Sequence, residues 1–467
     1  MSRYAPATPQ PTMASFNENL TSPASHGVIL LVAGFTAARR AIQIQGNPSK
    51  PSYQAMAKQS TSKVVKVSEE THAKLVALAK WGESLDQVVN RLVSQTKGLE
   101  DVVSGQSSIC FIDGHEGRLL YRGYDIVDLA PKSTYEETAF LLWDGHLPTV
   151  GELNSFSADM TAKRAVPKDV LSIMTALPKN CDAMDALRVG VAALGLYDDP
   201  MYTSAEKAQS IAAKISTIVA AIHRHKHDQE VLAPRDDLGY SSNFLYMVTG
   251  KVPSKEDERL MDALLILHAD HELNASTFAA RVIASTLSDV YSAVTGAVGA
   301  LKGPLHGGAN EKVIEMTIEI GNPENAESYI DALLSKRQKV TGFGHRVYKT
   351  MDPRAAILKD MAKHFIRSDK EKKVFQILEK TEEMMLTWKS LYPNVDLYSG
   401  LALNHVGIPS YLFTPVFAVG RAPGWLAHIL EQYADNRLIR PRAEYIGPLR
   451  AEYIPIEKRT QTAVVKH

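Results

Sequence analysis

Three histidines and one aspartate lie in sequence settings that are unusual for ordinary core or surface residues. Two of the histidines follow glycine-rich approaches, Gly303-Pro-Leu-His306 and Gly342-Phe-Gly-His345. Glycine allows a tight backbone turn and leaves amides free to face a ligand, so each of these histidines is a candidate polar group at a cleft. The other two candidates are His271, in an apolar stretch that reads as a helix, and Asp396, in Pro393-Asn-Val-Asp396.

One carboxylate and two imidazoles meet the needs of carbon–carbon bond formation between a keto-dicarboxylate and a thioester. The reaction needs a base for a weakly acidic α-proton, a donor for the resulting enolate and a donor that polarises the ketone. A dicarboxylate also needs cationic partners, and arginine pairs with carboxylates in a bidentate way. Candidate arginines in similarly punctuated settings are Arg354, Arg421 and Arg440.

A metal site is the competing interpretation of the same region. His268 and His271 are three residues apart, with Glu272 adjacent, and two histidines one helical turn apart can ligate zinc. The spacing is not His-Glu-x-x-His, and no third ligand can be assigned. We therefore predict no metal site.

The elements that must position these residues are mostly helical from Gly98 onward. Helical spacing of apolar residues predicts helices over 135–143, 205–223 and 257–288, the last of which contains His271. Strand-like alternation is confined to 108–112 and 118–121. No P-loop is found, and no Gly-x-Gly-x-x-Gly follows a strand, which argues against nucleotide-phosphate enzymes of those two types.

Composition narrows the class of protein further. The chain has 467 residues, with 52 Lys+Arg balanced by 52 Asp+Glu, which argues against a protein devoted to coating nucleic acid or anionic membrane. Two cysteines, Cys110 and Cys181, exclude a disulfide scaffold. The longest apolar run, 28–38, is too short to span a membrane, so we predict no membrane association. The C-terminal Val-Val-Lys-His is not a peroxisomal signal, and a cytoplasmic location is the default expectation.

The first hundred residues differ from the rest. Residues 1–60 are rich in Ser, Pro and Ala, which predicts a disordered extension; a transit peptide or a true start at Met56 are the alternatives. Residues 61–97 predict a strand and two helices capped by Ser68 and Ser84. This pattern resembles the ribbon-helix-helix modules of small DNA-binding antitoxins. A helical hairpin that decorates or dimerises the main body is favoured, so DNA is a possible but disfavoured partner.

Three motifs, in order, resemble the active-site signatures of the citrate synthase family. They are Gly303-Pro-Leu-His-Gly-Gly-Ala-Asn310, Gly342-Phe-Gly-His-Arg-Val-Tyr-Lys-Thr-Met-Asp-Pro-Arg354 and Pro393-Asn-Val-Asp-Leu-Tyr-Ser-Gly400. The resemblance runs from about Gly98 to Pro448 and includes Arg118-Leu-Leu-Tyr-Arg-Gly-Tyr-Asp125. It implies an acyltransferase that converts the acyl group to an alkyl group on transfer, condensing acetyl-CoA with oxaloacetate and water to citrate and CoA.

The resemblance also implies a role for each candidate. Asp396 would take a methyl proton from acetyl-CoA, His306 would stabilise the enol, and His345 would polarise or protonate the oxaloacetate carbonyl. Oxaloacetate would be held by these two histidines together with His271, Arg354, Arg421 and Arg440. Because Arg440 matches an arginine that reaches in from a second subunit, the resemblance implies a homodimer.

The CoA site is implied in the same way. The segment Lys339-Val340-Thr341-Gly342-Phe343 matches a main-chain cradle for the CoA adenine. Arg346 and Lys349 are then candidate partners for the phosphates. No cofactor and no metal are implied, because acetyl-CoA is a substrate.

The fold implied is all-α with two domains. A large helical domain would comprise 98–307 and 412–467, and a small domain, 308–411, would close over the substrates and exclude water from the thioester. Gly/Pro clusters at 303–308 and 407–409 are candidate hinges.

Two alternative functions remain. The 2-methylcitrate synthases share the scaffold and use propionyl-CoA, and one methylene in an apolar pocket is worth only ~1–3 kcal/mol. Asn394-Val-Asp-Leu-Tyr-Ser399 and Gly344-His-Arg-Val-Tyr348 favour the citrate enzyme. The other alternative is a DNA-binding regulator with a metabolite-sensing body. Retention of His306, His345 and Asp396 argues against it, because a pure binding protein has no need of the base.

Overall fold

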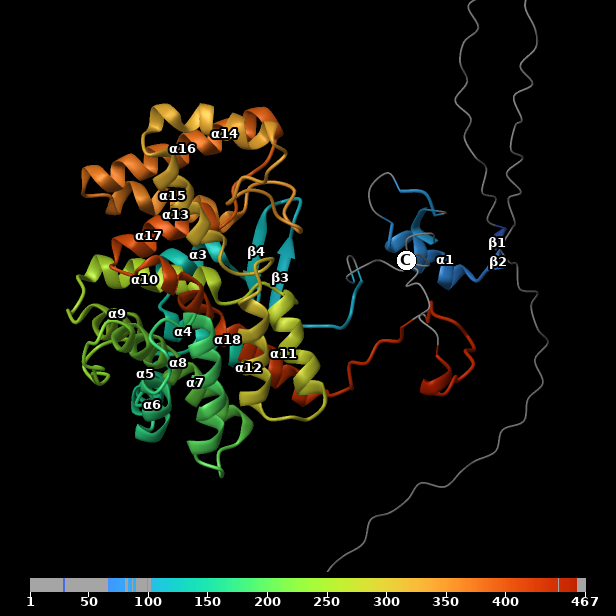
Figure 1. The fold of residues 1–467 in the computed structure, drawn as a ribbon, viewed down its shortest axis with the longest axis horizontal. Coiled ribbons are helices and arrows are strands. Elements are labelled where there is room, and N and C mark those ends of the chain that lie inside the picture. Colours follow the sequence, from blue (N-terminus) through green and yellow to red (C-terminus); the bar gives the residue numbers. More distant parts are fainter. Residues whose placement is uncertain are drawn as a thin grey trace, which may run out of the picture. The chain divides into compact units, whose positions relative to one another are not determined.

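The computed structural model describes residues 28–29, 66–79, 83–85, 87–89, 99, 102–443 and 445–459. The chain divides into two compact units, Met1–Gln106 and Ser107–His467 (Figure 1). The second unit contains every candidate site residue.

In the first unit, strand β2 (Lys66–Val67) pairs antiparallel with β1 (Val28–Ile29), and helix α1 (Glu69–Ala77) follows. The side chain of Ser68 caps α1 by accepting a hydrogen bond from the Thr71 amide at 3.2 Å, as predicted. Residues 85 and 87–89 are helical, and the Ser84 hydroxyl accepts from the Gln87 amide at 3.2 Å. Most of 1–60 and the rest of 61–97 lie outside the described residues, so the expected extension and the full three-element module stay predictions.

A small antiparallel sheet opens the second unit. Its strands are β3 (Cys110–Asp113), β4 (Arg118–Tyr121) and β5 (Tyr124–Asp125), in that order. The two predicted strand regions are therefore confirmed. Buried Leu119 and Tyr121 of β4 anchor the sheet on the helices.

The rest of the second unit is helical. Its first part comprises α3 (Ile126–Lys132), α4 (Tyr135–Asp144), α5 (Val150–Ala162), α6 (Lys168–Thr175), α7 (Ala183–Tyr197), α8 (Ser204–Lys226), α9 (Tyr240–Thr249), α10 (Lys255–His268), α11 (Ala275–Ser285) and α12 (Val290–Leu301). Its second part comprises α13 (Ala309–Ile320), α14 (Ala326–Ser335), α15 (Pro353–Phe365), α16 (Asp369–Lys389), α17 (Asp396–His405) and α18 (Phe413–Ala434), with short 3-10 helices η2 (Pro323–Asn325), η3 (Ser410–Leu412) and η4 (Ile456–Lys458). The predicted mostly helical fold is confirmed.

Side-chain caps fix where several helices begin. Thr134 caps α4, and Thr203 with Glu206 forms a capping box at α8. The predicted helices over 135–143 and 205–223 are confirmed.

The prediction of one continuous helix over 257–288 is wrong, because the helix is interrupted in its middle. Helix α10 ends at His268 and α11 begins at Ala275, so His271 lies in the connecting turn. The break has a local cause: the side chain of Asn274 accepts from the Thr277 amide and starts a new helix, and Glu272 has a left-handed φ of 53°. His268 and His271 therefore do not share a helical face, and the geometric basis for a two-histidine zinc site is lost.

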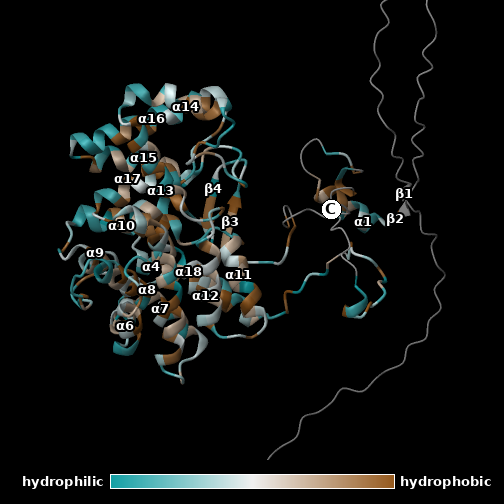
Figure 2. Cartoon of the chain, in the orientation of Figure 1, coloured by the Kyte–Doolittle hydropathy of each residue, from teal (hydrophilic) through white to brown (hydrophobic). Residues whose placement is uncertain are grey.

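Helix α18 lies at the centre of the second unit. It packs against α4, α8, α10, α11 and α12, and most of its residues are buried, including Arg421 and Trp425. Helices α13, α15 and α16 all pack on α17. Figure 2 shows hydrophilic residues along α16. The division into a large and a small domain at 307/308 and 411/412 stays a prediction.

None of the helices in the described ranges combines the length and apolarity that a membrane span requires.

Candidate active site

His306 lies in the turn between α12 and α13. The turn depends on its glycines: a Cβ added at Gly307 would lie 2.4 Å from the Leu301 carbonyl oxygen, and Gly308 has φ +80°. The glycine-rich sequence therefore brings the histidine back toward the helical core, where its side chain contacts α11.

Two groups fix the tautomer of His306. The Ser276 amide donates to its Nε2 at 3.3 Å, and the Ser276 hydroxyl lies 2.7 Å from the same nitrogen. The indole of Trp425 donates to that hydroxyl at 3.0 Å. Because an amide can only donate, Nε2 accepts, and in the neutral ring Nδ1 carries the hydrogen.

His345 has the opposite tautomer. Its Nδ1 accepts from the amides of Val347 at 3.0 Å and Tyr348 at 3.2 Å, within its own loop. The Nε2 of the neutral ring therefore carries the hydrogen and is the available donor.

His271 lies beside His345, with ring centroids 5.0 Å apart. The ring of Tyr348 packs on both, at 5.6 Å from His271 and 4.7 Å from His345. The Nε2 of His271 and the hydroxyl of Tyr348 are buried without a hydrogen-bond partner. A buried polar atom without a partner is costly, so a polar ligand is a natural partner for these atoms.

Arg421 reaches the same region from α18. Its Nε donates to the His268 carbonyl at 2.5 Å, and its guanidinium lies 4.8 Å from the centroid of Phe417. Its Nη1 is buried without a partner. The arginine is thus held at one end and has a free donor at the other, which suits a carboxylate.

Arg354 begins α15 and is anchored by its neighbour. The Asp352 carboxylate accepts from Nε at 3.0 Å and from Nη2 at 2.8 Å, and it also caps the helix through the Arg354 amide. Pro353 at the first helical position fixes this geometry. The bidentate pair is buried, so Arg354 is a rigid positive charge.

Asp396 is the first residue of α17. Its amide donates to the Asn394 side chain at 3.1 Å, and the amide group of Asn394 donates to the Gly344 carbonyl at 3.1 Å. Asn394 therefore ties the loop of Asp396 to the loop of His345.

The site shifts the pKa values of all four candidates. Burial raises the pKa of Asp396 to about 6, against the opposing charge of Arg354. Burial, followed by the charge of Arg421, lowers the pKa of His306 to about 4; burial and then Arg354 do the same for His345. Burial, with Arg354 next, holds the pKa of His271 well below its ordinary value.

The two arginines connect the candidates electrostatically. Arg354 acts on His271, His345 and Asp396, and Arg421 acts on His271 and His306. The structure thus gathers them around two fixed cations. Among the described residues, no hydrogen bond joins the Asp396 carboxylate to His306 or His345, so a substrate is needed to connect them. The two arginines can hold a dianion, His306 and His345 can each donate a hydrogen bond from a neutral N–H group, and the Asp396 carboxylate can accept a proton.

Comparison with known proteins decides the family. The family model for the citrate synthase C-terminal domain matches residues 98–442. The chain belongs to the citrate synthase family.

Individual relatives agree with this assignment. The chain is 47% identical to citrate synthase 2 of Bacillus subtilis over 373 residues, covering 79% of this chain and 100% of the relative. It is 46% identical to the citrate synthase of Deinococcus radiodurans over 371 residues, covering 78% and 98%. These matches confirm the predicted family and the predicted class of acyltransferase.

A solved structure is similar over the same length. It is the ternary complex of carboxymethyl coenzyme A and oxaloacetate with the citrate synthase of Thermoplasma acidophilum. The TM-score is 0.75 at 36% identity, and the match covers 78% of this chain and 100% of that one. The shared fold confirms the predicted all-α citrate synthase architecture.

The segment that citrate synthase resemblance assigns to CoA is a loop that packs on the Asp396 loop. Phe343 bridges to Pro393, and the Asn394 amide donates to the Gly342 carbonyl at 3.0 Å. Gly342 has φ +89°, and an added Cβ would lie 2.9 Å from a Leu397 methyl group. Main-chain geometry therefore dominates this loop.

The side chains around the loop differ in exposure. Val340 is buried, Thr341 is half-buried, and Lys339, Arg346 and Lys349 are exposed. The ammonium of Lys349 donates to the Arg346 carbonyl at 3.0 Å.

Arg440 is not gathered with the other candidates. It is exposed on the segment that follows α18, and no contact with the other candidates is found among the described residues. Large apolar side chains on the same segment are also exposed: Leu438, Tyr445, Ile446, Leu449, Tyr453 and Ile456.

Sequence reasoning missed several supporting residues. Ser276 and Trp425 set the tautomer of His306, and Asp352 anchors Arg354. Two signals were available: Asn274-Ala-Ser276 is a helix-start pattern, and Asp352-Pro353 is an N-cap followed by proline. Trp425 had no comparable local signal.

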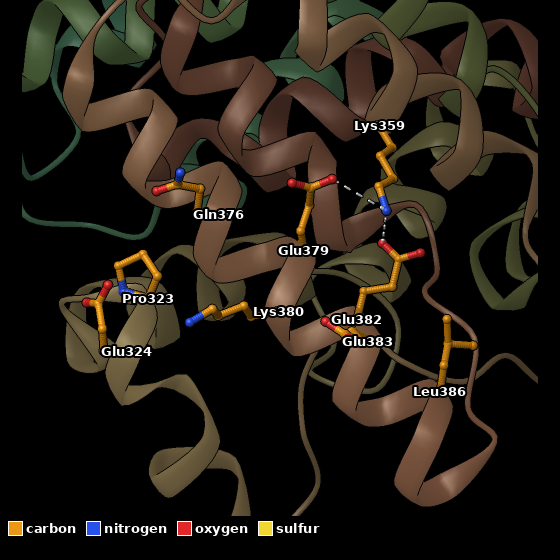
Figure 3. A pocket seen from close by; sticks show the side chains of 9 residues that line it. All are labelled: Pro323, Glu324, Lys359, Gln376, Glu379, Lys380, Glu382, Glu383 and Leu386. Atoms are coloured by element: carbon orange, nitrogen blue, oxygen red, sulfur yellow. Dashed lines mark hydrogen bonds and ion pairs between the residues drawn. The ribbon is translucent and has the colours of Figure 1, made fainter.

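A hollow of about 620 Å³ lies away from the candidates, between η2, α15 and α16 (Figure 3). In it Lys359 lies 2.9 Å from Glu382 and 3.8 Å from Glu379. Glu382 also accepts a hydrogen bond from Tyr398 of α17. The hollow therefore belongs to the packing that supports α17. No group of three or more metal-ligating side chains is found in the described ranges.

Proposed function

We propose that this chain condenses acetyl-CoA with oxaloacetate and water, giving citrate and CoA. The observation that carries the proposal is a carboxylate with a raised pKa that feels the charge of Arg354, as a neutral His345 also does, together with a neutral His306 of opposite tautomer that feels the charge of Arg421, in a family of this activity. No cofactor takes part, because the thioester supplies the activated carbon.

Asp396 is the proposed base. It removes a proton from the methyl group of acetyl-CoA, and the C–H electron pair forms the enol double bond while the thioester oxygen gains negative character or a proton. A raised pKa makes the carboxylate a stronger base than an ordinary aspartate. Asp396 is the first residue of α17, so the helix fixes the backbone that carries this carboxylate.

His306 and His345 are the proposed donors. The Nδ1 hydrogen of His306 stabilises the enol oxygen, and the Nε2 hydrogen of His345 polarises the ketone of oxaloacetate and is transferred to the new alkoxide. The enol carbon forms the bond to the carbonyl carbon. Water then cleaves the resulting thioester, releasing CoA as a thiol and leaving a carboxylate.

Arg421, Arg354 and His271 are the proposed holders of oxaloacetate. The Nη1 donor of Arg421 and the Nε2 of His271 are buried and lack hydrogen-bond partners, as expected of groups that meet a polar substrate.

A homodimer completes this proposal. Exposed Arg440 lies on a segment with strongly exposed Ile446 (94%) and Leu449 (95%), an apolar surface that fits burial against a second copy. In such a dimer Arg440 would contact oxaloacetate in the other subunit's site. The domain comprising 308–411, which carries Asp396 and His345, would close on the domain that carries His306.

The test is release of the CoA thiol by purified protein given oxaloacetate, with acetyl-CoA and propionyl-CoA at matched concentrations. A strong acetyl preference is expected. A propionyl preference would place the chain on the 2-methylcitrate branch with the same catalytic groups. No turnover with either would overturn the proposed reaction.

DNA binding through 61–97 stays a prediction that is separable from this activity. A gel shift with and without residues 1–97 tests it. A shift that requires 1–97 would establish a second function without changing the first.

A further inference from the structure

A buried chain of polar groups lies behind His271 and Arg421. The side chains of Asp270 and His428 are both fully buried, and Asp270 Oδ2 lies 3.1 Å from His428 Nε2. The other ring nitrogen, Nδ1, lies 3.3 Å from Nη1 of Arg281, which also donates to Glu431 at 2.8 Å. A guanidinium can only donate, so Nδ1 accepts and Nε2–H donates to Asp270.

Asp270 is held on several sides. Its amide donates a hydrogen bond to the Tyr121 hydroxyl at 3.1 Å, and that hydroxyl lies 2.9 Å from its carbonyl oxygen, to which it donates. The backbone of α18 passes close by, because a Cβ added at Gly424 would lie 2.6 Å from Asp270 Oδ1. That Oδ1 is buried without a hydrogen-bond partner.

Arg421 is the nearby cation that this carboxylate could pair with. Burial lowers the pKa of Arg421, and the charge of Asp270 is the largest opposing influence. The Nη1 of Arg421 nevertheless has no partner, and neither has Oδ1 of Asp270. Opposite charges attract strongly in a buried setting, so some other contact must keep these two atoms apart.

We propose that His428 is a positioning residue that holds Asp270 away from Arg421. Asp270 then serves as a countercharge, and Nη1 of Arg421 stays free for a substrate carboxylate. This inference rests on the proposed function, in which Arg421 binds oxaloacetate. Without the hydrogen bond from His428, the Asp270 carboxylate would rotate onto Arg421 and compete with the substrate.

Two substitutions of His428 separate this role from simple packing. In His428→Gln the longer amide can still donate to Asp270, whereas in His428→Asn it can reach toward Arg281 but not to Asp270. We expect His428→Asn to raise the KM for oxaloacetate about tenfold, the worth of one such hydrogen bond. The KM for acetyl-CoA should be unchanged, and His428→Gln should restore most of the affinity for oxaloacetate.

A double substitution tests the competition directly. Asn at position 270 cannot form an ion pair, so adding Asp270→Asn to His428→Asn should recover part of the lost affinity. A purely structural network predicts that the second substitution makes binding worse, or adds independently. The sign of the coupling therefore decides between the two.

Oxaloacetate binding is measured by thermal shift without acetyl-CoA, alongside steady-state kinetics. His225→Asn, which removes a histidine bond to the Leu177 carbonyl elsewhere in the unit, is the matched control. Equal oxaloacetate affinity in His428→Asn, His428→Gln and wild type would overturn the inference. A wild type that binds oxaloacetate but does not turn over would contradict only the proposed reaction; one that does not bind it would overturn both.

Discussion

Residues 268–276 and 417–432 form an inner side of the proposed site, whereas residues 339–354 and 392–396 form a loop side. On the inner side His271, Ser276 and Arg421 are buried; Trp425 of α18 donates to the Ser276 hydroxyl, and Arg421 donates to the His268 carbonyl. On the loop side the backbone itself makes most of the contacts, and Arg346 and Lys349 are exposed.

The difference matches the two substrates of the proposed reaction. A small dianion gains most from fixed charges in a buried setting, because they cost no reorganisation when it binds. A long CoA chain needs an open surface and main-chain contacts. The inner side, together with His345 and Arg354, should therefore set affinity for oxaloacetate, and the loop 339–343 should set affinity for acetyl-CoA, with Asp396 needed for turnover.

Asp396→Asn should have the largest effect, because it removes the base that both sides serve. We expect turnover to fall about a thousandfold. The fold should not be weakened: a carboxyl whose pKa is raised to about 6 destabilises the folded state when it is charged above that pH. Turnover and melting temperature measure the two effects. Both are recorded at about pH 7.5, roughly one to two units above that pKa.

Asp369→Asn is the control, since Asp369 also begins a helix, α16, but is remote from the site. Near-normal turnover in Asp396→Asn would contradict the base assignment.

Arg421→Lys tests the inner side by removing a donor for a carboxylate of oxaloacetate. Lysine cannot both bond the His268 carbonyl and present a second donor, so the KM for oxaloacetate should rise about a hundredfold. The KM for acetyl-CoA should change little, and steady-state kinetics in both substrates measure the ratio.

Arg164→Lys is the matched control, because Arg164 is equally buried and bonds the Leu238 carbonyl at 2.7 Å. If both variants lose oxaloacetate affinity equally, the effect belongs to folding and the comparison of sides fails.

The pH profile sharpens the assignment of roles. Asp396 must be ionised to accept a proton, and its pKa of about 6 predicts that kcat/KM falls as pH drops through that value, by about tenfold at pH 5. His306 and His345, with pKa values of about 4, stay neutral over this range. An acidic limb absent down to the ordinary aspartate range, about 4, would contradict the burial of Asp396.

Gly342→Ala tests the loop side by disturbing its packing on α17, and it should have the smallest effect on the kinetics. The added methyl group meets Leu397 at 2.9 Å in a left-handed backbone, so the loop must shift. We expect the KM for acetyl-CoA to rise about fivefold, an energy of about 1 kcal/mol, with the KM for oxaloacetate unchanged.

Gly344→Ala is the control, because Gly344 is also left-handed, with φ +77°, but an added Cβ there meets nothing within 4 Å. An equal effect of both substitutions would assign the loss to backbone strain rather than to the packing of the loop on α17.

Much of the fold was predictable because its signals are local. Alternation over 108–112 and 118–121 corresponds to β3 and β4, and Thr134 caps α4 where the pattern begins. The turn that carries His271 was missed because apolar residues continue at helical spacing on both sides of it. The N-cap of Asn274 and the left-handed Glu272 outweigh that periodicity.

The sequence by itself determined the family, the three motifs and the chemical types of the groups at the site. Only the tertiary structure decided which nitrogen of each histidine carries the hydrogen. It also decided that burial raises the pKa of Asp396 and that His428 Nε2 lies 3.1 Å from the Asp270 carboxylate. These properties depend on contacts between residues up to 158 positions apart, such as His428 and Asp270, and no local pattern encodes them.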